Sequence, residues 1–151
     1  MNKPYPLLLE RQLSRRLWGG TRLEEYLELD DPGPGEPLAE AWQVYGENLI
    51  LNGPLAGRTL ADVAAKQGAA LLGTESFSRY GHRVPLLAKF IDAARPLSIQ
   101  VQPDDDYALE NERHSGHLGK AEAWYILETE PGATIVWGVK RELDPAEVRE
   151  A

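Results

Sequence analysis

The sequence of 151 residues contains no cysteine. It therefore forms no disulfide bond and offers no thiolate to a metal ion, so a bound metal would need oxygen or imidazole ligands. No segment approaches the roughly 20 consecutive apolar residues that span a bilayer, and the apolar run near the N-terminus is too short for a secretory signal. These absences predict a soluble, cytoplasmic protein with no membrane partner.

Positive charge is also scarce. The chain has 16 Lys and Arg residues against 24 Asp and Glu residues, for a formal net charge of −8. Apart from the pair Arg15 and Arg16 there is no basic cluster, which argues against a nucleic-acid partner. An anionic small molecule would depend on a few local lysines, and Lys89 and Lys120 are the candidates.

The chain is long enough to bury one core, and its 42% hydrophobic content with no repeats predicts a single domain. Near the end, Asp144, Pro145 and Glu147 form a strong helix start. Ala151 follows barely two turns later, and so short a helix is marginal by itself. We therefore expect the polypeptide to be cut inside an element.

Several local signals predict secondary structure. Thr59, with an acidic residue three positions later, predicts the start of a helix that Gly68 ends. The paired glycines after Trp18 predict a turn. We expect strands at these segments: an edge strand around Leu7–Leu9, then Ala41–Tyr45, Asn48–Leu51, Pro85–Ile91 and Thr134–Gly138.

Residues 97–125 contain the pattern of polar residues that most strongly suggests a functional site. From Leu97 to Gln102 the residues alternate, which predicts a strand with an apolar face and a polar face. The polar face consists of Ser98, Gln100 and Gln102. A second predicted strand, Ala121–Leu127, continues this region.

The second strand places Glu122, Trp124 and Ile126 on one side, with Lys120 at its mouth. If the two strands are neighbours, two amide oxygens, a carboxylate and an ammonium converge, which is the composition of a metal and anion site. The alternative is two ordinary half-buried strands whose polar faces meet water. The spacing alone leaves both interpretations open.

A family resemblance bears on this choice. The runs PLLAKFIDA (85–93), LSIQVQPDDDYA (97–108) and GKAEAWYIL (119–127) resemble the core signature of type I mannose-6-phosphate isomerases, which are metal-dependent enzymes of the cupin class. Three further runs agree in order: LWGGTRL (17–23), AEAWQV (39–44) and LNGPLAGRTLADV (51–63).

The resemblance implies a mainly β fold, a cupin-like jelly roll with two or three short helices that is incomplete at its C-terminus. Residues 1–151 would be a single cupin-like domain, the N-terminal portion of a longer isomerase-like chain. The implied activity interconverts mannose 6-phosphate and fructose 6-phosphate. The alternative is a non-catalytic cupin module that binds a sugar or a sugar phosphate.

The resemblance also implies a metal site for zinc or another divalent ion. The family's glutamine and glutamate positions match Gln100 and Glu122, and the position of its first histidine holds Gln102. A second histidine would lie beyond Ala151. Because amide oxygen is a poor zinc donor, the set Gln100, Gln102 and Glu122 predicts weak zinc binding.

The implied chemistry needs a Lewis acid and a base that moves a proton between C1 and C2 through an enediol. Lys120 is the implied catalytic residue, because it can neutralise the developing negative charge. The implied substrate-binding residues are Ser98, Lys89 and Trp18. Trp18 is equally explained as a core aromatic, and Lys89 as a side chain that reaches solvent from the end of a barrel.

Other polar residues near this region have simpler explanations. His114 and His117 lie in a glycine-containing loop, where we expect them to be solvated rather than to bind a metal. His82 precedes a proline and is expected in a turn. Asp104 is expected to cap the short helix that follows it and to support the site.

Overall fold

The computed structural model describes residues 4–30, 33–114, 118–138, 140, 141, 144 and 147. The chain divides into two compact units, Met1–Ile99 and Gln100–Ala151. No helix among the described residues is long and apolar enough to cross a membrane.

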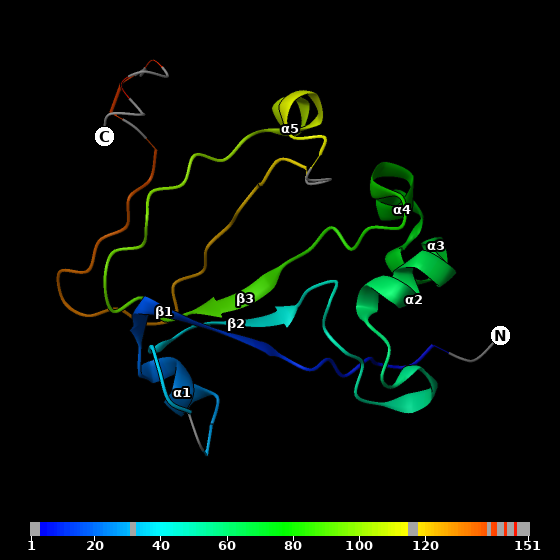
Figure 1. Cartoon of the computed structure of the whole chain (residues 1–151), viewed down its shortest axis with the longest axis horizontal. Helices are drawn as coiled ribbons and strands as arrows, with labels where there is room; N and C mark the ends of the chain where they lie inside the picture. Colours follow the sequence, from blue (N-terminus) through cyan, green and yellow to red (C-terminus); the bar gives the residue numbers. More distant parts are fainter. Residues whose placement is uncertain are drawn as a thin grey trace. The chain divides into compact units, whose positions relative to one another are not determined.

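The first unit contains a three-stranded antiparallel sheet in the order β1-β2-β3 (Figure 1). Its strands are β1 (Gln12–Gly20), β2 (Leu38–Val44) and β3 (Ala88–Ile91). Strand β2 confirms the strand expected near Ala41–Tyr45, and β3 occupies the second half of the segment expected at Pro85–Ile91. In β2 and β3 the β-branched and aromatic residues suit a pleated, half-buried surface.

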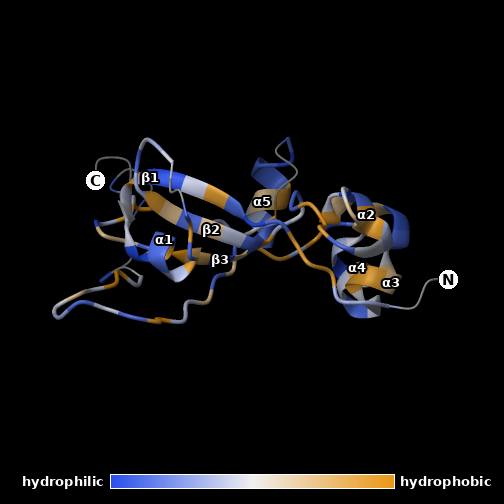
Figure 2. Cartoon of the chain, turned by 90° about the horizontal axis from the view of Figure 1, so that it is seen from below, coloured by the Kyte–Doolittle hydropathy of each residue, from blue (hydrophilic) through white to orange (hydrophobic). Residues whose placement is uncertain are grey.

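The two faces of this sheet differ in polarity. Leu13, Ala41 and Phe90 are cross-strand partners and form an apolar row. Ala41 and Phe90 pack with Leu23 from helix α1 (Arg22–Tyr26). Hydrophobic and hydrophilic segments alternate along β1 and β2 (Figure 2), so the face opposite this core is polar.

The predicted turn at Trp18 is wrong, because β1 continues through Gly19 and Gly20. A β-carbon on Gly19 would lie 2.7 Å from the carbonyl oxygen of Leu38, and one on Gly20 would lie 2.6 Å from the carboxylate of Asp92. Glycine is needed here because neighbouring groups approach the strand closely, not because the chain reverses.

Short helices follow the sheet's second strand. A 3-10 turn, η1 (Gly53–Leu55), precedes α2 (Leu60–Gln67), α3 (Ala69–Leu72) and α4 (Thr74–Tyr80). The three α-helices lie together within the first unit (Figure 1). The breaks between them fall at glycines with positive φ, a conformation that other residues avoid.

Helix α2 begins and ends as its sequence predicts. The Thr59 hydroxyl oxygen accepts a hydrogen bond from the Asp62 backbone N–H at 3.0 Å. Gly68, with φ of 50°, ends the helix, and its N–H donates to Ala64. Val63 and Ala64 are fully buried, so packing stabilises the helix in addition to its cap.

The remaining strands of the first unit are shorter than expected. Leu9, in the N-terminal arm, forms an isolated antiparallel bridge with Ile50. The segment Asn48–Leu51 therefore contributes bridges rather than a full strand.

The second unit contains α5 (Asp105–Asn111). Strands were predicted at Leu97–Gln102, 121–127 and 134–138, and these predictions are wrong, because the described residues there form no strand. A strand needs a hydrogen-bonded neighbour, and these extended segments have no ladder partner among the described residues. Their side chains are largely exposed, and Trp137 reaches 95%.

The described residues therefore form five α-helices and one 3-10 turn, more than the two or three helices expected. The helices contain more residues than the three strands, so a mainly β composition is not confirmed. What the structure establishes is a three-stranded antiparallel sheet with several helices.

Candidate functional site

Four polar side chains of the second unit form one connected cluster, which we call the Gln-Lys-Glu cluster: Gln100, Gln102, Lys120 and Glu122. The Lys120 ammonium lies 3.3 Å from a Glu122 carboxylate oxygen and donates to the Gln100 amide oxygen at 3.4 Å. The Gln102 amide nitrogen donates to the same carboxylate of Glu122. Segments 20 residues apart in the sequence thus meet through their side chains.

Backbone contacts beside α5 hold these two segments together. The Lys120 N–H donates to the Pro103 carbonyl at 3.1 Å, and the Gly119 N–H donates to the Asp105 carboxylate at 3.1 Å. A β-carbon on Gly119 would lie 2.3 Å from the backbone carbon of Asp104, so this approach needs a glycine. The segment before Lys120 is fixed against the start of the helix.

Asp104 has the structural role expected of it. Its carboxylate oxygen accepts a hydrogen bond from the Tyr107 N–H at 2.8 Å, which caps the first turn of α5. Asp105 and Asp106 add negative charge to that turn, where it interacts favourably with the helix dipole. The acidic run therefore stabilises the helix beside the cluster.

The cluster keeps Glu122 ionised. The hydrogen bond from Gln102 is the main cause that lowers the pKa of Glu122 below its ordinary value of 4.5, and the charge of Lys120 lowers that pKa further. Desolvation acts in the opposite direction, but the Glu122 side chain is still 28% exposed. At neutral pH the cluster offers a carboxylate beside an ammonium.

The cluster by itself does not fit a zinc ion. Its donors would be two amide oxygens and one carboxylate, and the ammonium of Lys120 already contacts two of these groups. In the described part of the chain, no group of three or more His, Cys, Asp and Glu residues is placed to bind a metal. Zinc favours imidazole and thiolate, so this donor set is poor.

The histidines do not improve the donor set. His114 is exposed, and its ring nitrogen lies 3.7 Å from a Glu112 carboxylate oxygen, in agreement with a solvated loop residue. The ring of His82 contacts the Ala64 carbonyl at 3.2 Å and packs edge-on against Phe77. His117 lies outside the described residues.

The predicted substrate-binding residues lie in the first unit. Trp18 is half-buried in β1, and Ser98 is exposed. The Lys89 ammonium is already paired, because it lies 2.6 Å from a carboxylate oxygen of Glu40 on β2. The side chains of Lys89 and Glu40 are only 18% and 11% exposed.

Sequence reasoning missed Glu40. Its second carboxylate oxygen accepts a hydrogen bond from the Trp42 indole N–H at 2.8 Å. The signal was present, since the lysine in the apolar run 85–91 needed a partner and AEAWQV offers a carboxylate on a strand. What the sequence lacked was the pairing of β2 with β3, which sets Lys89 opposite Trp42.

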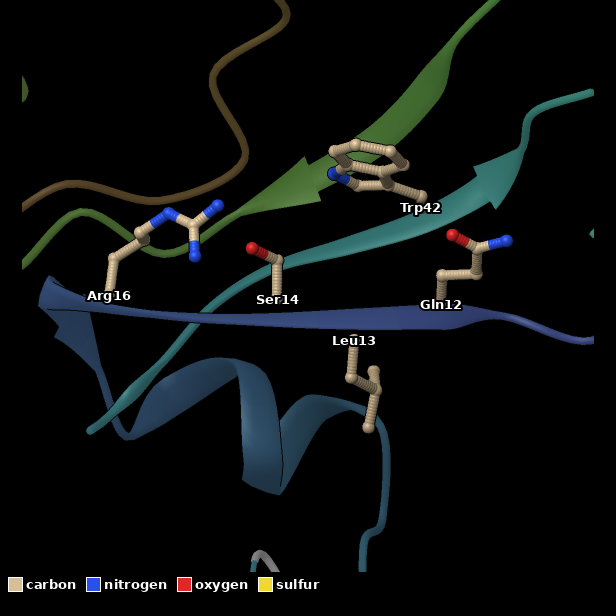
Figure 3. Close-up of a pocket in the computed structure, with 5 residues that line it drawn as sticks. All are labelled: Gln12, Leu13, Ser14, Arg16 and Trp42. Carbon is tan, nitrogen blue, oxygen red and sulfur yellow. The ribbon is translucent and has the colours of Figure 1, made fainter. Parts of the chain in front are cut away.

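A shallow pocket lies on the polar face of the sheet. Gln12, Ser14 and Arg16 project from β1 on the same side as Trp42 from β2, whereas Leu13 points to the other side (Figure 3). This pocket belongs wholly to the first unit.

Comparison with known proteins finds a family that matches most of the chain. Residues 7–131 match the family described as phosphomannose isomerase type I, catalytic domain. A probable mannose-6-phosphate isomerase of Bacillus subtilis is 40% identical over 136 residues, which cover 89% of this chain and 41% of that protein. A mannose-6-phosphate isomerase of Streptococcus mutans is 37% identical, with 88% and 40% covered.

Solved structures agree with the sequence relatives. A crystal structure of the mannose 6-phosphate isomerase from Bacillus subtilis has a TM-score of 0.62 and 33% identity, with 76% of this chain and 35% of that chain covered. A zinc-bound mannose 6-phosphate isomerase has a TM-score of 0.57 and 28% identity, with 74% and 29% covered. The chain spans about two fifths of the length of the curated relatives named above.

Proposed function

Because the chain belongs to the family of type I phosphomannose isomerase catalytic domains, we propose that the protein interconverts mannose 6-phosphate and fructose 6-phosphate. Residues 1–151 would be one cupin-like domain with a jelly-roll core, the N-terminal portion of a longer cytoplasmic isomerase. The coverage of the relatives supports a longer protein, since this chain matches about two fifths of each.

The Gln-Lys-Glu cluster is the observation that carries the proposal. An aldose-ketose isomerisation removes a proton from C2, forms an enediol, and returns a proton to C1. Negative charge develops on the substrate oxygens as the first proton leaves, and a nearby ammonium stabilises that charge. Lys120 is 42% exposed on its side chain, so its charge is accessible to a substrate.

Gln100, Gln102 and Glu122 are the proposed metal-binding residues of the longer protein, with Lys89, Trp18 and Ser98 as proposed contacts to the substrate. A zinc-bound relative supports a divalent metal. The donor set within this chain is too poor to bind zinc tightly without further ligands.

A second candidate is a non-catalytic module that binds a sugar or sugar phosphate. The donor set of two amides and one carboxylate favours it, because amide oxygen is a poor ligand for zinc. A zinc titration of a longer protein that supplies further ligands separates the two candidates. Tight zinc binding favours the isomerase, and its absence favours the binding module.

The experiment is a coupled isomerase assay on a chimera, in which this chain replaces the matched segment of the Bacillus subtilis relative. The proposal predicts metal-dependent turnover that Lys120→Met lowers by about 100-fold or more, since one charge-stabilising donor is lost. Lys66→Met, on the exposed side of α2, is the matched control and should leave turnover unchanged. Full activity of the Lys120→Met chimera would remove Lys120 from the catalytic centre.

A further inference from the structure

The N-terminal arm, residues 4–11, is fastened to the rest of the first unit by the side chain of Asn52. The Asn52 amide oxygen accepts a hydrogen bond from the Leu8 N–H at 2.9 Å. The amide nitrogen of the same side chain donates to the Pro6 carbonyl at 3.0 Å. Both ends of one amide group therefore bind the arm, which passes beside η1 (Figure 1).

Tyr5 adds a second set of contacts between the arm and this turn. Its hydroxyl donates to the Asn52 carbonyl at 3.2 Å and accepts from the Leu55 N–H at 3.2 Å. Its ring lies against Gly53, because a β-carbon at that glycine would approach the ring to 2.5 Å. Gly53 also has a φ of 65°, which other residues avoid. Docking of the arm thus requires a glycine directly after Asn52.

That glycine makes Asn52 chemically labile. Asparagine is a thermolabile residue, and glycine has no side chain to hinder attack by its own backbone nitrogen. The Gly53 nitrogen bonds to the side-chain amide carbon of Asn52, the bond from that carbon to the amide nitrogen breaks, and ammonia leaves with the proton of the attacking N–H. Water then opens the succinimide ring and gives aspartate or isoaspartate. Of the four asparagines in the sequence, only Asn52 precedes a glycine.

We propose that Asn52 is a deamidation site that the docked N-terminal arm protects, and that its conversion to an acid loosens the arm. Ring closure requires the Asn52 side chain to rotate onto the Gly53 nitrogen, which breaks its hydrogen bonds to Pro6 and Leu8. Gly53 is exposed, so solvent reaches the reacting bond once the arm opens. The reaction therefore proceeds from a locally opened state.

Deamidation changes what position 52 offers to the arm. An aspartate still accepts a hydrogen bond from the Leu8 N–H, but it has no amide hydrogen for the Pro6 carbonyl, so two oxygens face each other. An isoaspartate also lengthens the backbone by one carbon and displaces the carbonyl that Tyr5 contacts. The arm stays joined to the fold at the bridge between Leu9 and Ile50, so only the residues before this bridge are loosened.

The test for protection measures the rate of deamidation by mass spectrometry of the peptide that contains residue 52. We expect the folded 151-residue chain to react at least about tenfold more slowly than the same chain in urea. Tyr5→Phe keeps the ring but removes the hydroxyl, so it should speed the reaction of the folded chain about threefold or more. Tyr80→Phe, on α4, is the matched control and should react like the parent chain.

Hydrogen exchange tests whether the acid loosens the arm. The Leu55 N–H donates to Tyr5, so its exchange rate reports the docked arm. Asn52→Asp reproduces one deamidated product and should speed this exchange about threefold to tenfold, since one hydrogen bond is lost. Asn111→Asp makes the same chemical change in α5 of the second unit and should leave the exchange of Leu55 unchanged.

Three results would each overturn the proposal: no product at Asn52 in urea, equal rates in the folded chain and in urea, or unchanged Leu55 exchange in Asn52→Asp. A folded Tyr5→Phe chain that reacts like the parent would remove the arm as the protecting element. The comparison of the folded chain with the chain in urea needs no variant, so it decides protection even if a variant fails to fold. Neither measurement involves turnover, so both are independent of the isomerase assay.

Discussion

Lys89 and Lys120 both lie against a carboxylate, but their surroundings give the two pairs different roles. Lys89 and Glu40 are mostly buried between β2 and β3, and removing either partner would leave the other charge with little water around it. Lys120 and Glu122 are more exposed, and such a pair contributes only about 0–1 kcal/mol to stability. The first pair is part of the sheet, whereas the second remains open to a ligand.

The ionisation of Glu122 gives a prediction at this scale. Because its pKa is lowered in the folded chain, its interactions stabilise the fold above the ordinary value of 4.5 and are lost as the pH falls through the lowered pKa. Gln102→Leu should raise the pKa of Glu122, since the Gln102 hydrogen bond is its largest cause. A carbon-detected NMR titration of the Glu122 carboxylate measures this.

The control for that titration is Gln100→Leu. Gln100 contacts Lys120 rather than Glu122, so its removal should shift the pKa of Glu122 less. A parent chain in which Glu122 titrates at its ordinary value would contradict the geometry of the cluster.

Position 102 gives a second prediction. Gln102→His replaces a weak amide donor with an imidazole next to Gln100 and Glu122, and should strengthen zinc binding at least about tenfold. Calorimetric titration of zinc into the parent chain and the variant measures the change. His114→Ala should leave the zinc affinity unchanged, because that side chain is exposed and its ring nitrogen lies near Glu112 rather than near the cluster.

An unchanged zinc affinity in Gln102→His would mean that position 102 does not face the metal. Loss of zinc in His114→Ala would instead assign the loop histidine as a ligand.

Among the secondary-structure elements, helix ends were easier to predict from the sequence than strands. Thr59, Gly68 and Asp104 mark helix ends through contacts with residues at most four positions away, so the sequence alone contains both partners. Strand signals are weaker because a strand's ladder hydrogen bonds all go to neighbouring strands, which can be distant in the sequence. The alternation at Leu97–Gln102 predicted a strand with Gln100 and Gln102 on one face, but these residues form no strand. Their side chains contact Lys120 and Glu122.

The N-terminal cap of α2 should contribute measurably to the stability of the protein. Thr59→Ala removes the hydroxyl that accepts from Asp62 and should lower the free energy of unfolding by about 1 kcal/mol. Chemical denaturation followed by circular dichroism measures it.

Thr74→Ala is the matched control, because α4 begins without a side-chain cap. Its effect should stay within about 0.5 kcal/mol. Equal losses in the two variants would show that threonine at these positions acts through something other than capping.

At the scale of the whole molecule, sequence motifs identified the family, and the match over residues 7–131 confirms that identification. They did not give the balance of helix and strand, because strands form by pairing between segments that are distant in the sequence. The second unit exposes apolar side chains such as Val136 at 88%, and its extended segments have no ladder partner among the described residues.

The polar residues also differ in whether local sequence or long-range pairing identifies them. Gln100, Lys120 and Glu122 were predicted from local motifs, and their side chains contact one another within the second unit. Glu40 was missed because its importance depends on which strand lies beside it. Long-range pairing was therefore the missing information for both the fold and the site.

We propose that this chain supplies one part of the centre of a mannose-6-phosphate isomerase. A coupled assay of the 151-residue chain and of the chimera with the Bacillus subtilis relative, run side by side with zinc, tests it most directly. We expect no turnover by the chain alone, because its donor set is poor, and metal-dependent turnover by the chimera. Turnover by the chain alone, or a folded chimera that is inactive even with Gln102→His, would contradict it.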